Sequence, residues 1–67
     1  PVAAAPVANP ALAARMRAAG LAALNQGNVD RAVALLRRAS QLDPGNALIG
    51  RDLERAERIA RTVKARR

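Results

Sequence analysis

The chain contains no Phe, Tyr or Trp, although about half of its residues are hydrophobic. Most of that apolar content is Ala, and much of the rest is Leu and Val. Alanine favours the helix more than any other residue, but it contributes little buried area. A chain of 67 residues is also short for building a large core. The composition therefore predicts an all-α fold with a thin core and closely spaced helices.

Residues 1–9 (PVAAAPVAN) differ from the rest because they are rich in Pro and Ala, uncharged and without periodicity. Each Pro fixes its own backbone and disfavours helix at the preceding residue. We therefore expect a flexible linker at 1–9 and a helical domain at 10–67. Asn9 and Pro10 are typical of a helix start, because Asn is a favoured N-cap and Pro is tolerated at the first helical position.

The spacing of apolar residues predicts three helices, at about 10–25, 29–42 and 47–66. Two short segments separate them, Gln26-Gly27-Asn28 and Asp43-Pro44-Gly45-Asn46, and both are rich in turn-forming residues. Gly20 interrupts the first helix at a cost of about 1 kcal/mol relative to Ala. This cost indicates that another helix passes too close there for a side chain. The expected core consists of Leu12, Met16, Ala19, Gly20, Ala23, Ala32, Leu35, Leu36, Ala39, Leu42, Ile49, Leu53, Ala56, Ala60 and Val63.

The charge balance is strongly basic, with twelve Lys and Arg against five Asp and Glu, a net charge of +7. Such a balance favours an anionic partner, such as an acidic peptide, a nucleic acid or a membrane surface. A general bias of the chain towards Ala and Arg explains it equally well. On the third helix, two i,i+4 ion pairs are expected, Glu54–Arg58 and Glu57–Arg61.

Two tightly crossing helices require small residues at suitable spacing, and the chain has them at Ala19, Gly20, Gly27, Ala32 and Ala39. Leu36 lies among them on the second helix, and Pro44 follows that helix as part of an Asp-Pro. With these positions, residues 13–46 resemble one tetratricopeptide repeat. The resemblance implies an antiparallel helical hairpin of the α-solenoid type, with residues 47–66 as a capping helix. The first helix departs from the family pattern, because Met16, Ala19 and Ala23 stand where larger apolar or aromatic residues are usual.

The resemblance also implies a function, since the first helix of each hairpin in this family lines a groove that holds peptides. The residues expected to bind a partner are Arg17, Leu21, Leu24 and Asn25 on the first helix and Arg51, Arg55 and Arg58 on the third. Arg17 stands where some members clamp a terminal carboxylate, but Leu21 replaces the Asn of that clamp. We therefore expect a protein–protein interaction, scaffold or assembly module that is part of a larger protein, with an Arg-lined groove for an acidic segment. A homo-oligomer is a further option.

Catalysis is not expected from this composition. Without Cys or His, disulfides, thiolate chemistry and the usual zinc sites are excluded. Ser40 has no residue that could act as its base, and the glycines do not form a phosphate-binding loop. We expect no enzyme activity, no cofactor and no metal. No apolar run approaches the roughly 20 residues of a membrane span, no signal peptide is expected in residues 1–10, and the sequence indicates no particular compartment.

Two other functions remain open. The chain could be a structural or dimerisation segment of a larger enzyme, with no ligand of its own. It could also be a basic nucleic-acid-binding domain that neutralises phosphates, although it has no aromatic residue on which a base could stack. Binding to a membrane surface ranks below both, because the third helix has no aromatic anchor.

Overall fold

The structure is a computed structural model that describes residues 8–66. The described residues form three helices and no strand: α1 (Pro10–Asn25), α2 (Val29–Leu42) and α3 (Ala47–Ala65). The expected all-α fold is confirmed. α1 and α2 have the predicted bounds, and α3 ends one residue before the expected Arg66. Most of the expected linker, residues 1–7, lies outside the described residues, as does Arg67.

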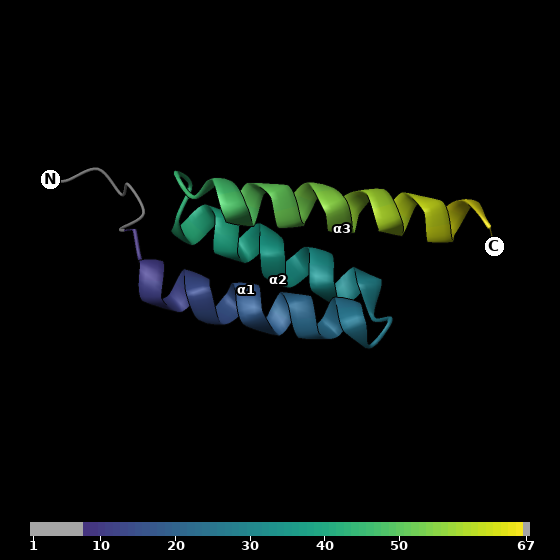
Figure 1. The fold of residues 1–67 in the computed structure, drawn as a ribbon, viewed down its shortest axis with the longest axis horizontal. Helices are drawn as coiled ribbons and strands as arrows, with labels where there is room; N and C mark the ends of the chain where they lie inside the picture. Colours follow the sequence, from purple (N-terminus) through teal and green to yellow (C-terminus); the bar gives the residue numbers. More distant parts are fainter. Residues whose placement is uncertain (1–7, 67) are drawn as a thin grey trace, which may run out of the picture.

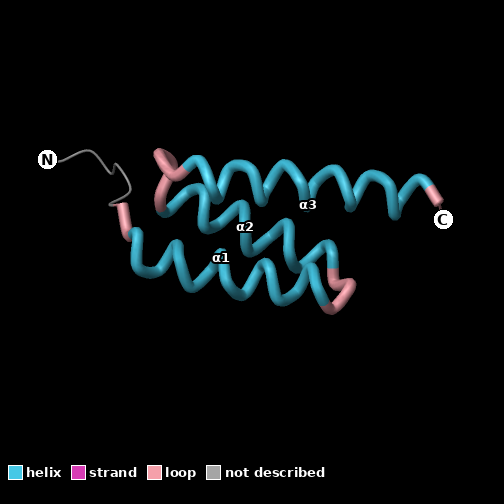
Figure 2. The backbone as a smooth tube through the Cα atoms, in the orientation of Figure 1, coloured by secondary structure: helices cyan, strands magenta, loops and turns pink. Residues whose placement is uncertain are grey.

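The three helices lie side by side with α2 in the middle (Figure 1). α2 packs extensively on α1 and less extensively on α3, whereas α1 and α3 barely touch. Short loops at opposite ends join the helices, so α1 and α3 run in the same direction and α2 runs against them (Figure 2). This arrangement leaves α1 and α3 bordering a shared face of α2.

Asparagine residues fix where each helix begins. The side chains of Asn9, Asn28 and Asn46 each accept a backbone N–H from the first turn, which satisfies a donor that the helix leaves unpaired. The backbone of Asn9 also donates to the Leu42 carbonyl at 2.8 Å, which ties the start of α1 to the end of α2. The capping bonds run from Leu12 N to Asn9 Oδ1 (3.1 Å), from Arg31 N to Asn28 Oδ1 (3.3 Å) and from Leu48 N to Asn46 Oδ1 (3.0 Å).

Gly27 follows the end of α1 in the left-handed conformation, with φ of 81°. Its N–H donates to the Leu24 carbonyl at 3.0 Å, and the next N–H, of Asn28, donates to the Ala23 carbonyl at 2.9 Å. These two bonds form a Schellman motif, in which glycine is preferred because a side chain is strained at this φ. The turn sends α2 back along α1.

α1 and α2 approach each other closely at Gly20, as its interruption of the helical pattern predicts. A Cβ atom placed on Gly20 would lie 2.8 Å from Cγ of Leu36. Leu36 is fully buried and is one of the two largest such side chains, with Ile49. The absent side chain of Gly20 therefore makes room for the main apolar side chain of α2.

The buried residues agree with the expected core only in part. Ala13 is fully buried although it was not expected to be, because it packs with Ala39 and Ile49 where α1 begins. The prediction for Ala19 is wrong: it is exposed, since it lies on a side of α1 that neither α2 nor α3 covers. Val63, also expected inside, is 37% exposed. The expected core residues that are only partly buried are Leu12, Met16, Leu35, Leu42, Leu53 and Ala60.

Candidate interaction groove

A groove of about 590 Å³ opens between the second half of α1 and the second half of α3. Its lining is mainly aliphatic, and Arg55 supplies a positive charge at its edge. The residues that line it are Leu21, Leu24, Asn25, Gly27, Val29, Arg55, Ile59 and Val63. Surfaces of this kind, apolar with a few polar groups, are typical of ligand and peptide sites.

The groove exists because only part of α3 is fully packed. The fully buried residues of α3 are Ile49 and Ala56, and both lie in its first ten residues. Beyond them, Ile59 and Ala60 are half-buried and Val63 is exposed. α3 also extends past the turn that joins α1 to α2 (Figure 1). Its last turns therefore keep apolar side chains that the other described helices cover only in part.

Two smaller cavities continue the open space around the end of α3. One, of about 110 Å³, lies between Gly27–Asp30 and the segment that contains Ala60, Val63 and Lys64. It shares Gly27, Val29 and Val63 with the groove. The other, of about 370 Å³, lies on the far side of α3 and is lined mostly by charged residues such as Arg37 and Glu57. The end of α3 is thus accessible from both sides.

An ion pair between α1 and α3 lies one helical turn before the residues that line the groove. Nε of Arg17 donates to Oδ2 of Asp52 at 2.5 Å, with the two side chains 35% and 19% exposed. Arg17 lies one helical turn before Leu21, and Asp52 lies one turn before Arg55. The pair therefore joins the two helices at the point where the apolar lining begins.

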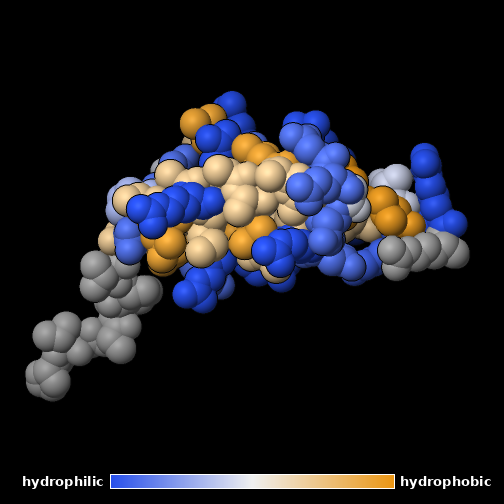
Figure 3. All heavy atoms as spheres, turned by 90° about the horizontal axis from the view of Figure 1, so that it is seen from below, coloured by the Kyte–Doolittle hydropathy of each residue, from blue (hydrophilic) through white to orange (hydrophobic). Residues whose placement is uncertain are grey.

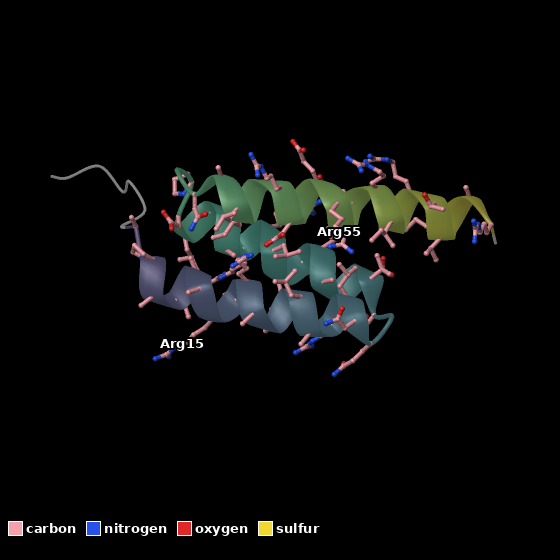
Figure 4. All side chains as sticks on the ribbon, viewed as in Figure 1. Arg15 and Arg55 are labelled. Carbon is pink, nitrogen blue, oxygen red and sulfur yellow. The ribbon has the colours of Figure 1, made fainter. Side chains whose placement is uncertain are left out.

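The structure brings four of the seven predicted partner-binding residues together. Leu21, Leu24, Asn25 and Arg55 line the groove. In Figure 4, Arg55 leans from α3 back over α2, whereas Arg15 on α1 points away from the helices. The other three predicted residues do not line the groove: Arg17 is paired with Asp52, and Arg51 and Arg58 are exposed elsewhere on α3.

Sequence reasoning missed Gly27, Val29 and Ile59 as lining residues and assigned Val63 to the core. Ile59 carried a usable signal, because it is a large aliphatic residue beside the apolar stripe of its helix. The expected ion pair of Glu57 with Arg61 is replaced by one with Arg37 on α2, at 3.1 Å. That contact depends on how two helices lie against each other, which spacing within one helix does not reveal.

None of the three cavities described above lies on the outer face of α1. The view from this side shows pale, weakly hydrophobic atoms along the middle, with several strongly hydrophobic groups and many hydrophilic atoms around them (Figure 3). The exposed residues include a row of small side chains, Ala11, Ala14, Ala18 and Ala22. Because these side chains end at Cβ, they form a shallow surface.

Within residues 8–66, no three His, Cys, Asp or Glu side chains come together as metal ligands would. No helix among these residues combines the length and hydropathy needed to cross a bilayer. No protein-family model matches the chain, and no curated protein or solved structure gives a significant match to it.

Proposed function

We propose that this chain is a protein-interaction module of the tetratricopeptide type, a helical hairpin with a capping helix, whose docking surface is the groove between α1 and α3. The accessible aliphatic lining is the observation that carries this proposal. Leu21 and Leu24 on α1 face the same space as Ile59 and Val63 on α3. Aliphatic side chains gain free energy when a partner removes them from water.

The resemblance of residues 13–46 to a tetratricopeptide repeat supports the same surface. In that family the first helix of each hairpin lines the peptide groove, and α1 is the corresponding helix here. The close approach of Gly20 to Leu36 agrees with the tight crossing that the family's small residues allow. Peptide binding in a groove also requires no catalytic group.

A second candidate is self-association, because an uncovered aliphatic surface can be buried equally well by another copy of the chain. Light scattering over a concentration series, with refractive-index detection, separates the two. A monomer leaves the groove available to a different protein. A dimer that the Val63→Glu substitution dissociates would assign the groove to assembly instead.

Selection from a random peptide display library tests the proposal directly. Peptides that bind the wild-type chain are re-tested against Val63→Glu, which places a charge in the groove. Thr62→Glu is the matched control, because Thr62 is exposed on the same turn and does not line the groove. We expect the selected peptides to bind the Thr62→Glu control but to bind Val63→Glu weakly or not at all. Equal binding to both variants, or no enrichment at all, would refute a groove-based interaction. Circular dichroism confirms that both variants remain helical.

A further inference from the structure

We infer, resting on the proposed function, that the groove accepts a short aliphatic segment with an acidic side chain, and that Arg55 is the residue that selects the acid. The aliphatic part follows from the lining, in which Leu21, Leu24, Val29, Ile59 and Val63 present no polar side-chain atom. Aliphatic side chains of a partner pack there without leaving a hydrogen-bonding group unsatisfied.

The acidic part follows from the one charged side chain that lines the groove. Arg55 takes part in neither of the ion pairs formed within residues 8–66, which are Arg17–Asp52 and Arg37–Glu57. A guanidinium beside an apolar surface binds a carboxylate strongly, through charge-assisted hydrogen bonds. The net charge of +7 attracts an acidic segment over a longer range and speeds its arrival.

Arg17 does not supply this recognition, because Asp52 already neutralises it. The carboxylate of Asp52 accepts from Nε of Arg17 at 2.5 Å. A ligand carboxylate placed beside Arg17 would also lie beside Asp52, and two like charges repel. Selection of the acid therefore falls to Arg55, one turn further along α3.

The dimensions of the groove limit the segment to a few residues. The lining on α3 runs from Arg55 to Val63, and the Arg17–Asp52 pair lies one turn before it. At 1.5 Å per residue this stretch of helix is about 12 Å long. An extended peptide covers that distance with about four residues, at roughly 3.3 Å each.

Charge and lining also decide against the other occupants. A second copy of the chain would bring another +7 to a surface that is already basic, so the two copies repel. A nucleic acid gains little from an aliphatic lining, because there is no aromatic residue for its bases to stack on. A short acidic segment of another protein satisfies both the lining and Arg55.

The test uses Arg55→Glu and its matched control Arg58→Glu, which makes the same charge change on an exposed part of α3 outside the groove. The probes are peptides recovered by the display selection, each synthesised also with its Asp or Glu replaced by Asn or Gln. We expect an aliphatic residue and an acid in the recovered peptides. We also expect at least about tenfold weaker binding to Arg55→Glu or with the amide version, and much smaller loss with Arg58→Glu.

The outcomes are distinguishable. Peptides that require Val63 but contain no acid, or that bind Arg55→Glu normally, would overturn the role of Arg55 and leave the groove as the docking surface. Equal losses with Arg55→Glu and Arg58→Glu would indicate diffuse attraction by net charge and would also overturn it. If no peptide depends on Val63, the proposed function itself fails. Restored binding of a Lys-substituted peptide to Arg55→Glu would establish the direct contact.

Discussion

Arg17 on α1 donates to Asp52 on α3 across 2.5 Å and so links two helices that otherwise barely touch. Both residues are partly buried, at 35% and 19% side-chain exposure, so water screens their attraction only in part. The pair also lies where the open groove begins. It therefore influences both the stability of the domain and the separation of the groove walls.

Replacement of Asp52 by Asn should destabilise the domain by about 0.5–1 kcal/mol, the range for a partly exposed pair. The loss should shrink as salt is raised, because ions screen the interaction in the wild type. Urea unfolding followed by circular dichroism measures both effects. The Arg17→Asp/Asp52→Arg double variant should regain much of the stability, whereas a double variant as unstable as the sum of the single changes would show that the pair does not interact.

Gly20→Ala should lower stability by about 1 kcal/mol, the difference between a cost of overpacking and a gain in helix propensity. The added Cβ would lie 2.8 Å from Cγ of the fully buried Leu36, and overpacking typically costs about 1–3 kcal/mol. The gain in helix propensity, about 1 kcal/mol, offsets only part of this. Gly50→Ala is the control, because a Cβ there has no atom within 4 Å. It should stabilise α3, and thermal unfolding of both variants checks the difference in sign.

Leu36→Asp should abolish cooperative folding. An unpaired buried charge costs about 3–5 kcal/mol, a large share of the roughly 3–10 kcal/mol expected for 67 residues. The control is Ala34→Asp, on the exposed side of the same helix. Far-ultraviolet circular dichroism should show loss of helix in the first variant and little change in the second. Full helicity in Leu36→Asp would contradict the assignment of the core.

Gly27→Ala should destabilise the turn between α1 and α2 by about 1–2 kcal/mol. Its φ of 81° is strained for a residue with a side chain. Gly45 provides the comparison, since its φ is not positive and its surroundings are open. Gly45→Ala should change stability little or raise it slightly. Equal melting temperatures for the two variants would contradict a conformational role for Gly27.

The helices could be predicted from the sequence because the signals that start and stop them are local. Asn28 caps α2 through the N–H of Arg31, only three residues away. Gly27 adopts its positive φ through bonds to the last turn of the same helix. Such contacts depend on a few neighbouring residues, so their spacing in the sequence identifies them. The close packing at Gly20 was predictable for another reason. Gly destabilises a helix relative to Ala, so its presence in α1 indicates a contact with a second helix.

The candidate site could be predicted less completely, because it depends on how the helices are placed relative to one another. The direction of Arg55 and the exposure of Val63 follow from how far α3 stays packed on α2. The pairing of Arg17 with Asp52 joins residues 35 positions apart. A pattern within one helix fixes which residues share a face, but not which residue of another helix meets that face.

The contact of Gly20 with Leu36 has a consequence for how this sequence can evolve. The two positions divide one fixed volume between α1 and α2, so a larger residue at either one requires a smaller residue at the other. Neither change is tolerated easily alone, and each becomes acceptable once the other has occurred. In sequences that share this hairpin, positions 20 and 36 should therefore vary together, and intermediates with two large residues should be rare.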